Sequence, residues 1–99
     1  MANFYLTNKA IEDLADIWNY TYETWSENQA DKYYQILLDN CQEIANNPGL
    51  GKNYHNVERS LFGVHVNKHI IFYRQHSEGF IEITRILHEM MDLKSRIKE

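Results

Sequence analysis

The side chains best suited to chemistry lie in the second half of the sequence, mainly between residues 69 and 92. His88 is a candidate general acid or base, because an imidazole gains and loses its proton near neutral pH. A ribonuclease that used His88 would also need cations to hold phosphate. Because no group of cations accompanies His88 in the sequence, catalysis is the alternative hypothesis, and we assign no catalytic residue. The candidates for holding phosphate would be Lys52, Arg59, Arg74 and Arg85.

Arg85 is the polar residue whose position most needs an explanation. It lies on an expected strand among isoleucines and a leucine, so its guanidinium must find a partner or reach water. One interpretation is an ion pair, with Asp92 as the candidate partner, that fixes the C-terminal segment to the sheet. The other is a polar hot spot on a contact surface, where Arg and Tyr are enriched. On the second interpretation, the residues predicted to contact a partner protein are Arg59, Tyr73, Arg74, Arg85, His88 and Asp92.

Other potentially reactive groups favour structural roles. His65 and His69 are four residues apart but fall on expected strands rather than on a helix, and Cys41 is a lone cysteine, so we predict no metal, cofactor or internal disulfide. Cys41 falls on an apolar helical stripe and is expected to be a buried, inert thiol. The carboxylates of residues 12, 13 and 16 are expected to form a solvated helix face.

Length and charge limit the class of protein. The 99 residues are expected to form a single domain over residues 1–99. The net charge is −4; residues 1–58 carry three basic and nine acidic side chains, and residues 59–99 carry seven and five. A concentrated positive surface is therefore not expected, and neither is direct sequence-specific binding of nucleic acid. The sequence shows no apolar run long enough for a membrane span and no secretory signal, so we expect a cytoplasmic protein.

Hydrophobic periodicity predicts an α+β fold in two layers. Thr7 and Ser26 are candidate N-caps for two consecutive amphipathic helices, and Asn47-Pro48-Gly49 ends the second one. The helices are expected to form an αα-hairpin packed on an antiparallel sheet. The expected elements are a strand over residues 3–6, helices over 8–25 and 26–46, strands over 61–66, 69–75 and 80–88, and a short helix or tail over 90–98.

The middle strand of this meander provides the main physical argument for a binding protein. Residues 70–73 are all apolar or aromatic, so they place apolar groups on both faces of the sheet. A two-helix hairpin covers only one face. The other face is therefore expected to be an exposed apolar patch, which usually marks a site for a partner.

The chain also resembles the ParE branch of the RelE/ParE toxin superfamily of type II toxin–antitoxin modules. The resemblance covers nearly the whole chain and rests on LTNKAIEDLADIWNYTYETW (6–25), NPGLGK (47–52), HIIFYR (69–74) and RILHEMMD (85–92), in that order. It implies the same fold, a helical hairpin on an antiparallel sheet. It also implies a non-enzymatic toxin that inhibits DNA gyrase and forms a hetero-oligomer with a ParD-like antitoxin, whose C-terminal segment wraps around it.

Two alternatives follow from the same superfamily. RelE-like toxins cut messenger RNA on the ribosome with basic residues near the end of the last strand. Here that end reads His88-Glu89-Met90-Met91, where many ParE-like chains carry a glycine and one or two arginines. The lower positive charge weakens the nuclease hypothesis. It also leaves open a degenerate toxin that binds antitoxin without harming the cell.

Overall fold

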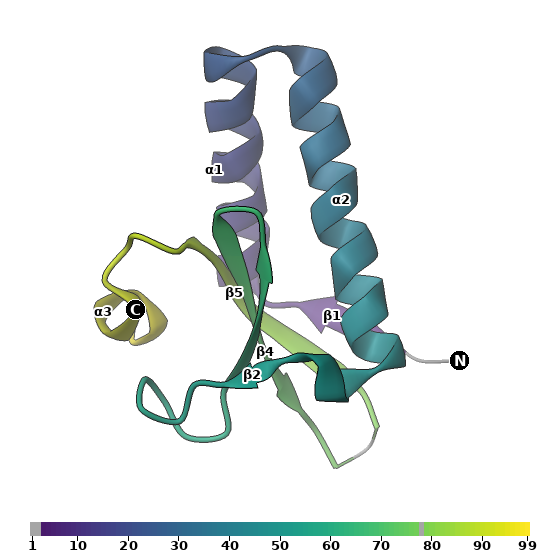
Figure 1. The fold of residues 1–99 in the computed structure, drawn as a ribbon, viewed down its shortest axis with the longest axis vertical. Coiled ribbons are helices and arrows are strands. Elements are labelled where there is room, and N and C mark those ends of the chain that lie inside the picture. The colour runs from purple at the N-terminus through teal and green to yellow at the C-terminus, as the bar shows by residue number, and fades with distance from the viewer. Residues whose placement is uncertain (1–2, 78) are drawn as a thin grey trace.

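The computed structural model describes residues 3–77 and 79–99, which form two long helices, a five-stranded sheet and a short C-terminal helix (Figure 1). The predicted α+β fold is confirmed. In chain order the elements are β1 (Phe4–Leu6), α1 (Asn8–Thr24), α2 (Glu27–Asn46), a 3-10 turn η1 (Pro48–Leu50), β2 (Lys52–Asn53), β3 (Phe62–Val66), β4 (His69–Gln75), β5 (Ile81–His88) and α3 (Leu93–Ile97).

Both long helices begin where the sequence places a capping residue. The Thr7 hydroxyl accepts a hydrogen bond from Ala10 N at 3.1 Å, and the Ser26 hydroxyl accepts one from Gln29 N at 3.1 Å. These bonds satisfy amide groups that have no partner within the helix. Because only two residues separate α1 from α2, the helices run antiparallel as a hairpin.

The sheet differs from the prediction at its two edges. Its order is β1-β5-β4-β3-β2, and β1 pairs parallel to β5 with Phe4 opposite Ile81. The sheet is therefore mixed rather than antiparallel, because β1 and β5 run in the same direction whereas the other neighbouring strands alternate. The other edge is β2, which has two residues and is too short to be recognised from a sequence pattern. The β3–β4 turn is as predicted, with Asn67 at φ 55°.

The sheet separates two apolar clusters. On one face the hairpin packs on side chains from β4 and β5 that include Ile71, Tyr73 and Ile83. On the other face Ile70 and Phe72 meet a second cluster. Its remaining members are Tyr54, Val57, Leu61, Leu87, Leu93 and Ile97, contributed by β5, α3 and the segment that follows β2.

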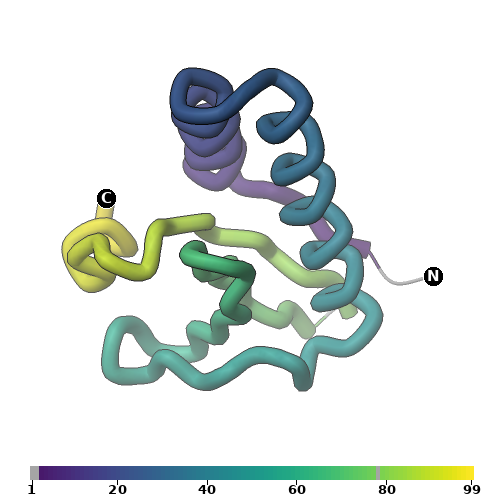
Figure 2. Tube along the Cα trace, turned by 45° about the horizontal axis from the view of Figure 1, so that its top comes forward, coloured from purple at the N-terminus to yellow at the C-terminus, as the bar shows by residue number. Residues whose placement is uncertain are grey.

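The expectation of an exposed sheet face is therefore wrong. Ile70, Phe72 and Leu87 are at most 2% exposed, because α3 and residues 54–61 cover them. Figure 2 shows the segment that follows β2 and the hairpin on opposite sides of the sheet. The long helices are not the whole cover of the sheet, because a loop and a one-turn helix shield its second face.

The large exposed apolar side chains lie mostly on the helices. Trp25 and Tyr20, near the hairpin tip, are 74% and 68% exposed. A 20-residue helix such as α2 spans about 30 Å, whereas the five residues of β3 span about 17 Å. The hairpin tip consequently projects past the β3–β4 turn (Figure 1). Within the described residues, no helix is long and apolar enough to span a membrane.

Candidate functional site

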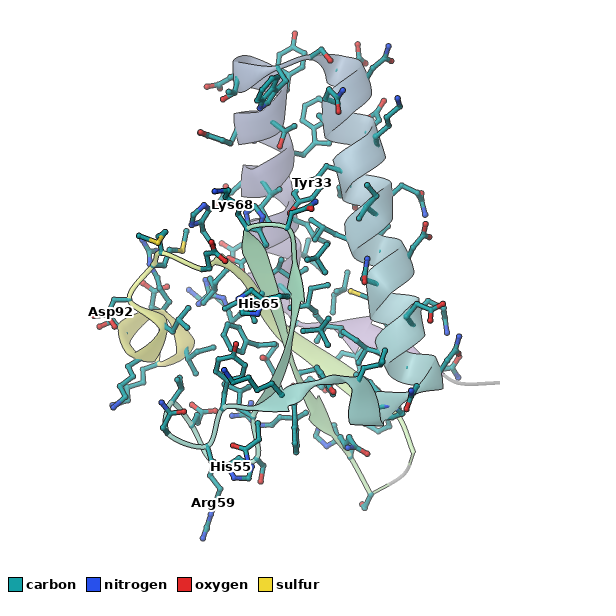
Figure 3. The ribbon with its side chains drawn as sticks, viewed as in Figure 1. Tyr33, His55, Arg59, His65, Lys68 and Asp92 are labelled. Atoms are coloured by element: carbon teal, nitrogen blue, oxygen red, sulfur yellow. The ribbon has the colours of Figure 1, made fainter. Side chains whose placement is uncertain are left out.

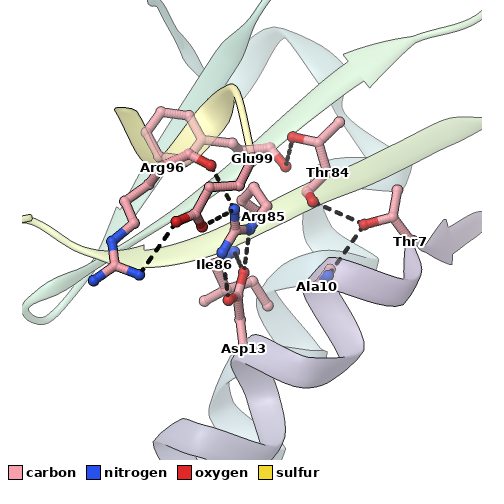
Figure 4. A network of polar contacts seen from close by, with 9 residues as sticks. Thr7, Ala10, Asp13, Thr84, Arg85, Ile86, Arg96 and Glu99 are labelled. Atoms are coloured by element: carbon pink, nitrogen blue, oxygen red, sulfur yellow. Dashed lines mark hydrogen bonds and ion pairs between the residues drawn. The ribbon is translucent and has the colours of Figure 1, made fainter. Parts of the chain in front are cut away.

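Arg85 is buried and forms an ion pair with Asp13 of α1. Arg85 Nε and Nη2 donate to the two carboxylate oxygens at 2.8 and 2.9 Å, and the backbone N–H of Ile86 donates to the same carboxylate at 3.0 Å (Figure 4). The hydrogen bond to Asp13 raises the pKa of Arg85. A β-bulge lies at this point, because Phe72 pairs with Arg85 whereas Tyr73 pairs with Ile83.

The same guanidinium also holds the C-terminal helix. Arg85 Nη1 donates to the backbone carbonyl of Arg96 at 2.5 Å and to the Glu99 carboxylate at 3.3 Å. A cation at the C-terminal end of a helix is electrostatically favourable. Arg85 therefore links the sheet to the C-terminal segment, as one interpretation of the sequence held. The predicted pairing with Asp92 is wrong, because the partners are Asp13, the Arg96 carbonyl and Glu99.

Three of the sequence-based expectations around this network need correction. Arg85 is only 7% exposed, so it is not placed to contact a partner. Asp13, which was expected to be solvated, is 9% exposed. Asp92 instead caps α3, accepting from Ser95 N at 3.4 Å and Ser95 Oγ at 3.0 Å. These bonds with Ser95 lower the pKa of the exposed Asp92 carboxyl.

Tyr73 is also not a surface residue. Its side chain is completely buried on the helix-facing side of the sheet. Its hydroxyl donates to Pro48 O at 2.6 Å and accepts from Gly51 N at 2.9 Å. Tyr73 therefore anchors the segment between α2 and β2, and in the free chain its side chain is not exposed to a partner.

A Tyr73→Phe variant is expected to lose about 1–2 kcal/mol of unfolding free energy, because it leaves the Pro48 carbonyl and the Gly51 amide without this partner. Urea denaturation followed by circular dichroism would measure the loss. Tyr34→Phe, at an exposed position on α2, is the matched control and is expected to change stability little. Equal stabilities of the two variants would contradict the anchoring role.

The cations proposed to hold phosphate do not gather around His88. Arg74 forms an ion pair with Glu58, and it lies opposite Glu82, at the other end of β4 from the His69–His88 pair. Lys52 lies over the ring of Tyr54, with Nζ 5.5 Å from the ring centroid. Arg59 is exposed on the segment after β2 (Figure 3). Arg85 shares a cavity with His88, but its donors are already bound.

His88 does meet a second histidine. The rings of His69 and His88, paired across β4 and β5, lie 5.4 Å apart and nearly perpendicular. Tyr33 Oη lies 2.7 Å from His69 Nδ1 and 3.1 Å from Val66 O, within hydrogen-bond distance of both. Burial, followed by the charge of His88, lowers the pKa of His69.

These histidines line a groove of about 420 Å³ between the hairpin tip and the β3–β4 turn. Figure 3 shows two of the residues that line it, Tyr33 and Lys68, near the β3–β4 turn. The groove is lined by Tyr20, Thr21, Trp25, Gln29, Tyr33, Asn67, Lys68, His69 and His88. Of the residues predicted to contact a partner, only His88 belongs to it. Sequence reasoning missed the groove because its walls come from segments that lie far apart in the chain.

Comparison with known proteins shows the family. Residues 4–93 match the family described as the ParE toxin of the type II toxin–antitoxin system, parDE. Toxin ParE1 of Mycobacterium tuberculosis is 32% identical over 94 residues, covering 94% of this chain and 96% of that protein. Toxin ParE1 of Caulobacter vibrioides is 31% identical over 97 residues, covering 98% and 99%.

Solved structures share the fold at low sequence identity. The chromosomal ParDE system from P. aeruginosa contains a chain with a TM-score of 0.77 and 18% identity, covering 89% of this chain and 96% of that one. A chain of the toxin–antitoxin complex RelBE2 from Mycobacterium tuberculosis has a TM-score of 0.69 and 16% identity, covering 88% and 96%. The fold is therefore common to both branches, whereas the sequence match is specific: the chain belongs to the ParE toxin family of type II toxin–antitoxin systems.

Proposed function

We propose that this protein is a cytoplasmic toxin that inhibits DNA gyrase by binding it, without catalysis, and that a ParD-like antitoxin neutralises it. Family membership supports the role of toxin, and the P. aeruginosa relative of the same fold is described as part of a ParDE system. The gyrase target and the ParD-like antitoxin are the parts of this proposal that go beyond family membership.

The observation that favours binding over catalysis is the arrangement of charged groups. The cations that an endoribonuclease would place around phosphate are here paired with carboxylates or lie away from His88. By contrast, large aromatic side chains at the hairpin tip are exposed, as expected for a protein that works through contact surfaces. Of the predicted contact residues, those outside the buried network and core remain candidates: Arg59, Arg74, His88 and Asp92.

A supercoiling assay tests the target. The purified chain is expected to inhibit supercoiling of plasmid DNA by gyrase and to increase the amount of cleaved DNA. Addition of the protein encoded by the adjacent reading frame is expected to restore activity. A ribosome-dependent RNA cleavage assay run in parallel separates the mechanisms, because a toxin that acts by binding gyrase leaves messenger RNA intact.

The alternative function is a RelE-like ribosome-dependent endoribonuclease, which the His69–His88 pair keeps under consideration because two imidazoles lie side by side. The alternative predicts cuts at defined codon positions in ribosome-bound messenger RNA, abolished by His88→Gln, with gyrase unaffected. That result would overturn the proposed target. A chain that affects neither gyrase nor messenger RNA but binds the adjacent gene product would be a degenerate toxin.

A further inference from the structure

The last residue pair of the β4–β5 ladder consists of two histidines, and each is tied to a different part of the fold. His69 and His88 are direct partners across the strands, with ring centroids 5.4 Å apart. His69 Nδ1 lies 2.7 Å from the hydroxyl of Tyr33 on α2, so this ring links the end of the sheet to the hairpin. His88 Nδ1 accepts a hydrogen bond from the backbone N–H of Met90 at 3.1 Å, which holds the turn that follows β5.

The hydrogen bond from Met90 defines the protonation state of His88. A backbone N–H can only donate, so Nδ1 must carry a lone pair, and the hydrogen of the neutral ring is on Nε2. When the ring gains a second proton, Nδ1 becomes a donor and faces another donor. The hydrogen bond is then lost, and the turn after β5 loses one of the contacts that hold it.

A proton on His69 is opposed by the surroundings of its ring. Burial is the main cause that lowers the pKa of His69 below its ordinary value of 6.5; the charge of His88 lowers it further, whereas Glu89 raises it. Because the pKa is lower in the folded chain, the unfolded chain binds this proton more readily. The contribution of neutral His69 to stability is therefore complete above about pH 6.5 and is lost as the pH falls through the lowered pKa.

Charged groups on the surrounding elements also act on the protons of the pair. Two ion pairs there are each neutral as a whole, Asp13 with Arg85 and Glu99 with Arg96. The other charged side chains described at the adjoining cavities, or acting on His69, are the carboxylates of Glu12, Asp16 and Glu89 and the cations of Lys9 and Lys68. These charges nearly cancel, so burial and the mutual repulsion of the two rings decide the effect of a proton.

Three further titratable groups lie near the pair. Two are the tyrosines Tyr20 and Tyr33, which line the same cavity, and burial raises the pKa of Tyr33. The third is His65 of β3, whose Nε2 lies 3.6 Å from the Glu89 carboxylate. Protonated His65 therefore competes for the carboxylate that would favour a proton on His69.

We propose that the His69–His88 pair is a pH-sensitive switch that releases the end of β5 and the turn after it when the imidazoles gain protons. In the neutral pair each ring holds one contact, to Tyr33 or to Met90. In the protonated pair two positive rings face each other, and His88 repels the Met90 N–H. Residues 89–92 connect this turn to α3, so the release also loosens the connection to the helix that covers the second sheet face. The switch depends on the fold alone, and on neither gyrase nor an antitoxin.

NMR spectroscopy of the full chain at two pH values tests the release. Between about pH 7.5 and about pH 5.5 the amide proton of Met90 is expected to shift upfield, because its hydrogen bond is lost. The order parameter of the same amide should fall from about 0.85, the value of rigid backbone, toward about 0.6. The amide of Ile83, in the middle of β5, should keep its chemical shift and order parameter, which distinguishes local release from unfolding of the whole chain.

A His88→Asn variant removes the titration and keeps the hydrogen bond, because the asparagine Oδ1 can accept from the Met90 amide at every pH. Met90 should then stay rigid at both pH values. The titration midpoint of His69 should rise, since the charge of His88 is gone, but should stay below 6.5, since burial remains. His55→Asn is the matched control: His55 is exposed on the segment after β2, at the far end of the sheet from Lys68 (Figure 3), and the wild-type changes should persist.

Three results would overturn the proposal. The first is an order parameter of Met90 that does not change with pH in the wild type. The second is an equal fall in His88→Asn, which would show that another group controls the turn. The third is a change at Ile83 together with Met90, which would show that acid unfolds the chain as a whole.

Discussion

An Asp13→Ala variant is expected to lose about 3–5 kcal/mol of unfolding free energy, a large part of what a domain of this size has available. The substitution leaves the buried Arg85 guanidinium without its carboxylate and the Ile86 amide without its acceptor. Both defects lie at the contact between α1 and β5, the strand that also pairs with β1. The melting temperature should fall by roughly 15 °C or more.

Thermal unfolding followed by circular dichroism would measure this loss, with Asp16→Ala as the control. Asp16 lies on the same helix but is exposed, so its removal should change stability by no more than about 0.5 kcal/mol. The double variant Asp13→Leu with Arg85→Met should recover much of the stability, because it removes both buried charges together. If Asp13→Ala proved as stable as Asp16→Ala, the ion pair would not be an important link between helix and sheet.

The sequence predicts that Arg85 needs a partner but does not identify that partner. The apolar neighbours of Arg85 predict that it needs a partner, and proximity in the sequence favours Asp92. The actual partner is 72 residues away. A local signal did exist: Asp13 lies three residues after Ala10 and four before Ile17, so it falls on the edge of the buried stripe of α1. Reading the stripe for its polar members would have found it.

Removal of residues 93–99 is expected to cost about 2–4 kcal/mol of stability and to make the protein self-associate. Leu93 and Ile97 would no longer cover Ile70 and Phe72, and Arg85 would lose two of its acceptors. The apolar sheet face that this exposes resembles the patch that the sequence alone predicted. Chemical denaturation and size-exclusion chromatography at several protein concentrations would measure both effects.

Two double variants of the full-length chain separate the loss of apolar cover from the loss of the hydrogen-bond acceptors of Arg85. Leu93→Ser with Ile97→Ser removes the apolar cover and keeps the backbone acceptor at Arg96, so it should self-associate with a smaller loss of stability. Lys94→Ala with Lys98→Ala changes exposed residues of the same segment and should behave like the wild type. A truncated chain that stays monomeric and equally stable would show that α3 does not shield the sheet.

The fold was predictable where the signals are local. Thr7 and Ser26 mark their helix starts through hydrogen bonds to residues three positions ahead, and Asn67 marks its turn through its own backbone angle. The cover of the second sheet face was not predictable in this way. It depends on where Leu61 and Leu93 come to lie in space, and their sequence neighbourhoods look like a polar loop and a tail. The groove has the same origin, since two distant segments form it.

The parallel pairing of β1 with β5 has a consequence for the synthesis of this protein. The first strand finds its hydrogen-bonding neighbour only in the last one, and Thr7 donates to Thr84, 77 residues further along the chain. Contacts of such long range are slow to form and require the whole intervening chain. A nascent polypeptide that ends before residue 81 therefore lacks the strand that closes the structure. The complete fold, and any activity that depends on it, is therefore expected only after translation is nearly complete.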